Sequence, residues 1–266
     1  MPGLTQHLAS LTTVPTYAEA TNHPFLAAAA NGTLPADRLA LWLSQDRIYA
    51  SHAYPAFIGS LIASIPRDSS HGIYSREERT NQHILSVMVY CLENVVREVN
   101  FFKETAEQWN LPLDVWKERK ETKDYTAEMG RISKSGRMED ALIFLWAMER
   151  VYLDAWSFVA KGLQSSGIEQ ATAISSLAKN WSNNEFVEFV DKLARLVDDL
   201  QIQPGTDMWK RAEAIWLRVV ELEVGFWPVE GEEKTLRSDY RLSVQILYRT
   251  YTVPTQNECI LIAKLQ

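Results

Sequence analysis

Three acidic side chains stand in segments that are otherwise apolar and aromatic: Asp46, Glu149 and Glu223. A carboxylate on an apolar helix face is costly to bury without a partner, so each of them marks a candidate polar site. Two carboxyl groups that share one closed pocket push one pKa upward, which yields an acid and a base from one residue type. If Glu149 and Glu223 meet in this way, the pair can transfer protons, while Asp46 can accept hydrogen bonds from a polar heterocycle.

Each of these carboxylates also has a purely structural interpretation. Asp46 can pair with an arginine from another helix, and Glu149 can form an ion pair of the same kind. Glu223 can simply be exposed, because Glu221 and Glu223 flank Leu222 in the sequence. Spacing along the chain does not show whether Glu149 and Glu223 face one cavity, so both interpretations stay open at this stage.

Metal sites and nucleophilic sites find little support in the sequence. His83 with Glu78 and Glu93 is the nearest approach to a ligand cluster, and the histidines form no HExxH pair. Cys91 and Cys259 have no CxxC spacing, and no GxSxG elbow occurs. We therefore expect neither a bound metal nor a cofactor, and we expect both thiols to be reduced.

Hydrophobic residues recur at steps of three and four along most of the chain, which is the period of amphipathic helices. After a loose start, Thr33 and Pro35 mark the entry of a first long helix, which should kink or end at Pro55. The stretch over 138–161 is apolar on every side, so we expect it to be central. The helices expected after Pro55 run over about 76–102, 117–134, 138–161, 168–179, 184–199 and 207–226. No strand pattern persists, which predicts an all-α fold.

Composition narrows the class of protein further. The 266 residues include 46% hydrophobic side chains and carry a formal net charge of −7, which predicts one compact core and argues against nucleic-acid binding. The apolar runs fall short of the roughly 20 residues that cross a bilayer. The N-terminus has no pattern of a secretory signal, so we expect a cytoplasmic protein without membrane contact. Aromatic residues make up 11% of the chain, which suits a pocket for a planar ligand.

Four segments, in one order, resemble motifs of the TenA (thiaminase II) family. They are Trp42–Tyr49, similar to the QD-x-x-Y helix; Lys123–Thr126, similar to the YT segment; Ala141–Tyr152, similar to the central helix; and Glu223–Trp227, similar to the E-x-x-FW ending. The resemblance covers about Leu4 to Trp227 and implies the all-α, haem-oxygenase-like helical bundle without implying haem. We expect this single domain over 1–228, and a C-terminal extension over 229–266 with a final helix and a tail.

One branch of that family has a nucleophilic cysteine at the position where this chain has Leu145. The segment Trp146–Tyr152 instead resembles the glutamate branch with its WAxExVY pattern, and Trp181–Phe186 is similar to the W-x-N-x-x-F stretch of that branch. Glu149 follows Leu145 by one helical turn, so it projects from the same face. The resemblance implies thiamin-pyrimidine salvage, in which aminomethyl- or formamidomethyl-pyrimidine breakdown products are hydrolysed to hydroxymethylpyrimidine.

The same resemblance implies roles for the candidate residues. Glu223 with Glu149 would supply acid and base catalysis at the C–N bond, and Asp46 would bind the aminopyrimidine. Aromatic side chains that would stack on the ring or offer hydroxyls are Tyr49, Tyr125, Tyr152, Trp181 and Phe226. Ala53 departs from the aromatic residue that the family often has at that position.

The implied partner is a small pyrimidine, and family behaviour implies a homo-oligomer, most simply a homodimer. The alternative is a non-catalytic helical protein that binds a pyrimidine or regulates, keeping the pocket without the chemistry. Retention of all three carboxylates favours the enzyme. The two interpretations differ in whether these carboxylates converge on one enclosed cavity.

Overall fold

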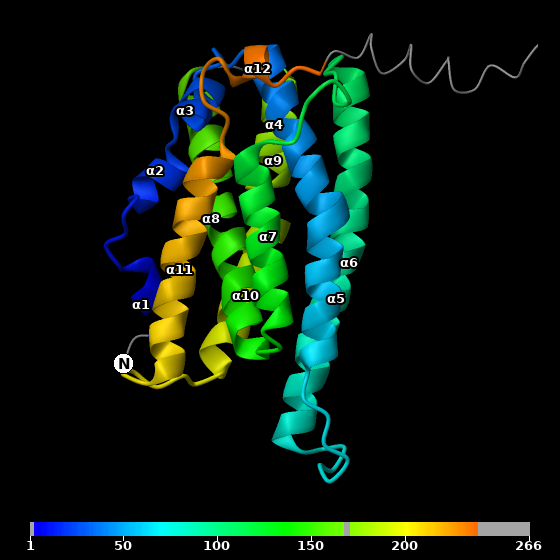
Figure 1. Ribbon diagram of the computed structural model, residues 1–266, viewed down its shortest axis with the longest axis vertical. Coiled ribbons are helices and arrows are strands. Elements are labelled where there is room, and N and C mark those ends of the chain that lie inside the picture. The colour runs from blue at the N-terminus through cyan, green and yellow to red at the C-terminus, as the bar shows by residue number, and fades with distance from the viewer. Residues whose placement is uncertain (1–2, 168–170, 239–266) are drawn as a thin grey trace, which may run out of the picture.

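A computed structural model describes residues 3–167 and 171–238, and this part of the chain contains helices but no β-strand (Figure 1). The predicted all-α class is confirmed. The elements in chain order are α1 Leu4–Ala9, α2 Tyr17–Thr21, α3 Pro24–Ala30, α4 Ala36–Ile48, the π-helical turn η1 Tyr49–Ala53, α5 Tyr54–Ser64, α6 Arg76–Gln108, α7 Lys120–Lys134, α8 Met138–Ser165, α9 Ala173–Asn180, α10 Asn184–Asp199, α11 Asp207–Phe226 and α12 Glu232–Thr235. Residues 168–170, at the predicted start of one helix, and 239–266, most of the predicted extension, lie outside the described residues.

Helix α8 is the centre of the bundle, as its apolar composition predicted. Between Ala141 and Met148 every side chain is buried, and Phe144 and Leu145 have no exposed surface. Helices α11, α10 and α3 make the most extensive contacts with α8, and α2, α9, α5 and α7 make less extensive ones. Burial on all sides explains why the stretch over 141–148 carries no polar residue.

The π-helical turn η1 joins α4 to α5 in one continuous column. The helix continues through Pro55, because Pro55 lies in the first turn of α5, where a missing N–H group costs little. The N–H of Tyr54 bonds to the carbonyl of Tyr49, five residues back, so the irregular turn comes just before the proline. The rings of Tyr49 and Tyr54, at the two ends of the turn, lie 5.9 Å apart.

The first 30 residues are more helical than the loose start that the sequence suggested. A capping box between Thr16 and Glu19 begins α2, and Pro24 opens α3 at a position that favours proline. Phe25 and Leu26 of α3 are buried in the core, where α3 packs on α8. Helices this short show too few repeats of the helical period to be recognised from their pattern.

After α11 the chain folds back over one end of the bundle, where α12 lies (Figure 1). The buried guanidinium of Arg119 donates to both carboxylate oxygens of Glu232, at 2.9 and 3.1 Å, and to the carbonyls of the last two residues of α11. Arg38 forms a second bidentate pair with Glu233. These contacts fasten the described start of the expected extension to the helical domain. The boundary at residue 228 stays a prediction.

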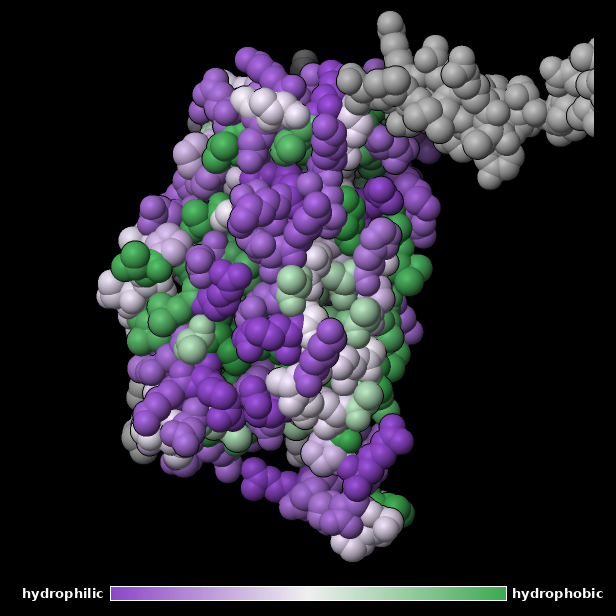
Figure 2. Space-filling model, in the orientation of Figure 1, coloured by the Kyte–Doolittle hydropathy of each residue, from purple (hydrophilic) through white to green (hydrophobic). Residues whose placement is uncertain are grey.

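Most of the molecular face in Figure 2 is hydrophilic, and hydrophobic residues show both along the edge that α6 forms and on the opposite side, near α1 and α2. On α6, Val89 and Val96 are 44% and 64% exposed. Helices α5 and α6 run side by side and extend beyond the other helices (Figure 1). Among the helices of the described residues, none has the length and apolar character needed to span a membrane.

Candidate active site

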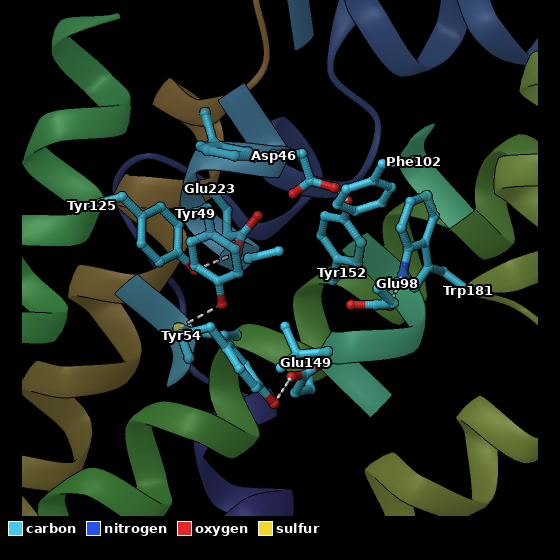
Figure 3. A pocket seen from close by; sticks show the side chains of 14 residues that line it. Asp46, Tyr49, Tyr54, Glu98, Phe102, Tyr125, Glu149, Tyr152, Trp181 and Glu223 are labelled. Atoms are coloured by element: carbon cyan, nitrogen blue, oxygen red, sulfur yellow. Dashed lines mark hydrogen bonds between the residues drawn. The ribbon is translucent and has the colours of Figure 1, made fainter. Parts of the chain in front are cut away.

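A cavity lies inside the bundle between α4, η1, α5, α6, α7, α8 and α11 (Figure 3). Its empty space, including the opening, is about 510 Å³. Four carboxylic acids, seven aromatic rings and three smaller side chains line it: Asp46, Glu98, Glu149 and Glu223; Tyr49, Tyr54, Phe102, Tyr125, Tyr152, Trp181 and Phe226; Ala50, Val95 and Met148. Within the described part of the chain, its lining includes no lysine, arginine or histidine.

All eight residues that the sequence analysis nominated lie on this lining. They are Asp46 from α4, Tyr49 from η1, Tyr125 from α7, Glu149 and Tyr152 from α8, Trp181 from the end of α9, and Glu223 and Phe226 from α11. The three predicted carboxylates therefore face one cavity from three different helices. Their roles in binding and catalysis remain predictions.

Asp46 is 4% exposed and accepts a hydrogen bond from the hydroxyl of Tyr152 at 2.9 Å. Its partner in the cavity is thus a phenol rather than the arginine of the structural interpretation. Burial raises the pKa of Asp46 well above its usual range, and the nearby charge of Glu98 raises it further, while the Tyr152 hydrogen bond opposes both. A carboxyl that is held partly protonated can both accept and donate a hydrogen bond, which matches the amine and ring nitrogen of an aminopyrimidine edge.

Glu149 accepts a hydrogen bond from the hydroxyl of Tyr54 at 2.8 Å, so the predicted alternative of an arginine partner is not found here either (Figure 3). Burial raises the pKa of Glu149 to about 8, with further contributions from the charges of Glu98 and Glu223. The Tyr54 hydrogen bond lowers the pKa and so partly offsets this rise. A carboxyl that titrates near 8 can act as an acid or a base close to neutral pH.

Glu223 is 2% exposed, so the interpretation of an exposed surface glutamate is wrong. The hydroxyl of Tyr125 donates to its Oε1 at 2.5 Å, while its Oε2 is buried without a hydrogen-bond partner. Burial raises the pKa of Glu223 to about 8, against the lowering effect of the Tyr125 hydrogen bond. An unpaired buried carboxyl oxygen is costly, and this one lies on the wall of a cavity where a ligand can pair with it.

Two polar residues of the lining, Tyr54 and Glu98, were not predicted from the sequence. Glu98 lies on α6 and accepts a hydrogen bond from the indole N–H of Trp181 at 2.6 Å. The signal that could have found it is the same one that marked Asp46, because Val95, Glu98 and Phe102 follow one another at helical spacing on a largely apolar face.

Aromatic rings orient the polar groups of the cavity. The ring of Tyr152 stacks on Trp227, at 5.9 Å and 15°, and meets Trp181 edge-on at 5.2 Å, which directs its hydroxyl to Asp46. Tyr49 lies edge-on to Tyr125 at 5.4 Å. Packing of this kind limits the rotation of the rings, so their hydroxyl groups are fixed in advance.

Gln45 ties the wall that carries Asp46 to the start of α7. Its side chain is fully buried and accepts hydrogen bonds from the backbone N–H of Arg119 at 2.8 Å and from the hydroxyl of Thr122 at 3.0 Å. Its amide also donates to the carbonyl of Lys117 at 3.2 Å. Since a satisfied buried amide fixes both segments, Gln45 holds the relative position of the two helices.

No thiol faces the cavity in the described residues. Leu145 is fully buried one turn before Glu149, and Cys91 is buried outside the lining. The described residues also contain no group of three His, Cys, Asp or Glu side chains that could hold a metal ion. What the cavity offers is carboxyl and phenol chemistry in an aromatic enclosure, which suits a small planar ligand with amino groups.

Comparison with known proteins identifies the family. Residues 12–232 match the model of the TENA/THI-4/PQQC family. A Glycine max protein named "Probable bifunctional TENA-E protein" is 22% identical over 212 residues, which are 79% of this chain and 86% of that protein. A Fusarium pseudograminearum protein named "Probable transcription factor" is 25% identical over 259 residues; the match covers 85% of this chain and 51% of that protein, so the chain spans about half its length.

Solved structures of TenA homologues have a similar fold. The crystal structure of a TenA homologue from Pyrococcus furiosus superimposes with a TM-score of 0.69 at 19% identity, over 84% of this chain and 98% of that one. This similarity confirms the predicted haem-oxygenase-like bundle, in a single domain. Because the family model matches well over half of the chain, the protein belongs to the TENA/THI-4/PQQC family.

Proposed function

We propose that this protein is a hydrolase of thiamin-pyrimidine salvage, which cleaves the C–N bond of aminomethyl- or formamidomethyl-pyrimidines and releases hydroxymethylpyrimidine. The observation that carries the proposal is the convergence of Asp46, Glu149 and Glu223 on one enclosed aromatic cavity. Membership of the TENA/THI-4/PQQC family and the TENA-E name of the Glycine max relative support it.

In this proposal the aminopyrimidine binds with its polar edge against Asp46. The exocyclic amine donates to the carboxyl group, and the carboxyl proton, retained because the pKa is raised, bonds to the adjacent ring nitrogen. Tyr152 holds the carboxyl from the other side. The rings of Tyr49, Tyr125 and Phe226, within 6.0 Å of one another, supply flat apolar surface for the heterocycle.

Glu223 and Glu149 then exchange protons with the reacting groups. The oxygen of a water molecule forms a bond to the methylene carbon while the C–N bond breaks, its electron pair passing to nitrogen. A carboxyl group gives a proton to the leaving nitrogen, and a carboxylate takes one from the water, so the net proton count of the enzyme does not change. The raised pKa of both residues, to about 8, keeps each form accessible near neutral pH.

We assign the protein to the glutamate branch of the family because the position before Glu149 by one turn is Leu145 rather than cysteine. Without a thiol in the described lining, two routes to product are consistent with the residues present. An activated water can attack the methylene carbon directly, or a carboxylate can attack first and be released by hydrolysis. Incubation in ¹⁸O water followed by mass spectrometry of Glu149 and Glu223 after single turnover tests the second route, because water that attacks the carbonyl of the carboxylate ester leaves its oxygen in the protein, whereas direct attack leaves it only in the product.

The test of the proposed function is a hydrolysis assay with both pyrimidines, in parallel with calorimetric binding of the same compounds. Turnover to hydroxymethylpyrimidine supports the enzyme. Binding without turnover supports the alternative of a regulatory or pyrimidine-binding protein, which corresponds to the name of the Fusarium relative as a transcription factor. The homo-oligomer implied by the family resemblance stays a prediction, which light scattering tests.

A further inference from the structure

Glu98 is the one carboxylate of the described cavity lining to which the proposed reaction gives no role. It projects from α6 into the cavity on the side of Trp181, apart from the helices that carry the other three acids (Figure 3). Its charge is the largest electrostatic influence on both Asp46 and Glu149, ahead of that of Glu223. Glu98 is therefore close enough to both ends of the cavity to interact with a ligand that lies between them.

The surroundings of Glu98 favour its ionised form more than those of the other three acids. The indole N–H of Trp181 donates to its carboxylate at 2.6 Å, and Arg97 and Asn180 on the outer side also favour the charge. Burial still raises the pKa of Glu98, but Glu149 and Glu223 are raised to about 8 and stay largely protonated at neutral pH. Glu98 is thus the acid of the cavity whose carboxylate is supported by an indole N–H donor at the cavity wall and by a nearby arginine.

Arg97 lies on the outer side of Glu98, and the described lining of the cavity carries no positive side chain, so a cation that meets Glu98 inside the cavity has to come from a ligand. A metal ion is not indicated, because no group of three acidic, histidine or cysteine side chains in the described residues could hold one. Glu223 is 2% exposed, and its Oε2 has no hydrogen-bond partner, so it offers a second polar group to a ligand in the same cavity. Both features fit an organic amine, which offers a charge and several N–H donors in one small group.

We propose that Glu98 is a specificity-determining residue that selects a substrate with a protonated aminomethyl group over one with a neutral formamidomethyl group. The inference rests on the proposed function and names the substrate class within it. The carboxylate of Glu98 binds the ammonium group, while Asp46 binds the opposite edge of the ring. When the amine binds as its ammonium, the nitrogen leaves as ammonia without taking a further proton, and the ionised form of Glu223 or Glu149 takes the proton of the attacking water. Proton donation by a carboxyl group to the leaving nitrogen is then needed only for the formamide.

A formamide cannot use this arrangement in the same way. Its nitrogen is uncharged with a single N–H donor, and its carbonyl oxygen is an acceptor that a nearby carboxylate repels. Hydrogen bonds between two charged groups are roughly twice as strong as neutral ones, and the enclosed cavity screens them weakly. The charge of Glu98 should therefore affect the two substrates in opposite directions or to very different extents.

The test compares Glu98→Gln with the wild-type protein, by measuring the consumption of each pyrimidine at pH 7. The amide keeps the shape of the side chain and an oxygen that accepts from Trp181, but removes the charge. We expect kcat/KM for the aminomethyl compound to fall about 10- to 100-fold and kcat/KM for the formamidomethyl compound to change less than about 3-fold. Equal losses on both compounds, or no loss on either, would overturn the inference.

Three further measurements separate charge from packing. Glu98→Asp keeps the charge on a shorter side chain and should retain the preference for the amine, whereas Trp181→Phe removes the N–H donor and should weaken it. Glu104→Gln is the matched control, an exposed glutamate on the same helix, and should leave both substrates unaffected. If the ratio of kcat/KM for the two substrates depends neither on the charge at position 98 nor on the indole N–H donor, the inference is wrong.

Binding by the wild-type protein keeps this inference distinguishable from the proposed function. Competitive binding of the 5-aminomethyl pyrimidine against its 5-methyl analogue needs no turnover, and Glu98 should make the ammonium compound bind at least about 10-fold more tightly. If neither pyrimidine is hydrolysed while this preference exists and is lost in Glu98→Gln, the proposed reaction fails and the role of Glu98 stands. If hydrolysis occurs and the preference is absent, the role of Glu98 fails alone.

Discussion

Tyr125 donates its phenolic hydrogen to one oxygen of Glu223 at 2.5 Å, and the other oxygen of that carboxyl group has no partner. The two residues come from α7 and α11, so their contact closes one side of the cavity. One oxygen of Glu223 is thus fixed by the protein, and the other is left for a ligand. This asymmetry is what a proton-transferring group requires, because an orientation held by the protein costs nothing at the moment of reaction.

Replacing Glu223 with glutamine should abolish most of the turnover. The amide preserves shape and reach but cannot transfer a proton, so we expect kcat to fall by about 10²- to 10⁴-fold, the usual contribution of a general acid or base. Circular dichroism and the thermal midpoint should show an intact fold. A variant with near-normal turnover would move the catalytic role to Glu149.

Glu149→Gln tests the separate roles of Glu149 and Glu223 in proton transfer. A milder loss than that of Glu223→Gln is expected if Glu149 only orients the water or Glu223, and a comparable loss if the two act as a coupled pair. Tyr125→Phe is the matched control, since it removes the fixing hydrogen bond and leaves the carboxyl in place. It should cost less than Glu223→Gln, and an equal cost would show that orientation rather than proton transfer is what the reaction needs.

Asp46→Leu should impair binding more than chemistry. Leucine has a similar shape, but it can neither accept a hydrogen bond from the amine of the pyrimidine nor donate one to the ring nitrogen. KM should rise by more than about 10-fold with a smaller change in kcat, whereas Tyr152→Phe, which removes only the partner of Asp46, should give a weaker effect in the same direction. An unchanged KM in Asp46→Leu would mark Asp46 as structural.

Several elements and residues of the structure could be predicted from the sequence. The uniform burial of α8 from Ala141 to Met148 followed directly from its apolar pattern, and α11 begins and ends where its period predicted. Asp46, Glu149 and Glu223 stood out because charge on an apolar face is rare. Periodicity places such residues on the inner side of a helix, but it does not say which inner sides meet. Their convergence depended on the family resemblance.

Other parts of the molecule depend on contacts between segments that are distant in the chain. Tyr54 reaches the cavity because η1 turns the chain by one extra residue before Pro55, a change that no hydrophobic pattern records. Glu98 is held by Trp181, 83 residues away, and α6 has so many charged residues that one inward-facing acid does not stand out. The short helices before Ala36 form because α8, α10 and α11 cover them, since isolated helices of this length are unstable.

Intact thiamin should be a poor substrate. Its leaving group is a thiazolium, which the family resemblance assigns to displacement by a thiol in the cysteine branch, and we propose Leu145 as the corresponding position in this chain. We expect kcat/KM for thiamin to lie at least about 100-fold below that for the better pyrimidine, because covalent catalysis by a thiol is missing. Efficient cleavage of thiamin at pH 7 would contradict this prediction.

Removing the hydroxyl of Tyr54 should move the pH profile of the reaction. The Tyr54 hydrogen bond lowers the pKa of Glu149, which burial holds at about 8, so Tyr54→Phe should raise that pKa further. Whichever limb of the kcat/KM profile reports Glu149 should therefore shift to higher pH. Tyr90→Phe serves as the control, because it removes a phenol hydroxyl that bonds to Glu185 outside the cavity lining. A profile with both limbs unmoved in Tyr54→Phe would show that Glu149 does not titrate in the reaction.

The buried carboxyls should also make the folded protein less stable as the pH rises. Glu149 and Glu223 titrate near 8 in the folded protein and near 4.5 in the unfolded chain, so between these values the folded state binds more protons. Below about pH 4.5 these groups contribute fully to the free energy of unfolding of the folded protein. This free energy then decreases as the pH rises through about 8. Asp46 and Glu98, whose pKa values are also raised, act with the same sign.

His23 opposes this trend, but only at lower pH. Burial lowers its pKa from 6.5 to about 4, so its contribution to stability grows between these values and is constant above them. From about pH 7.5 to 8 the titration of His23 is nearly complete and thiols have barely begun to ionise, and there the free energy of unfolding measured with urea should fall with rising pH. Glu149→Gln and Glu223→Gln should each flatten this slope, because an amide has no proton to lose. Glu104→Gln, an exposed change on α6, should leave the slope as it is, and a wild-type slope of zero would show that the carboxyls are already ionised in the folded protein.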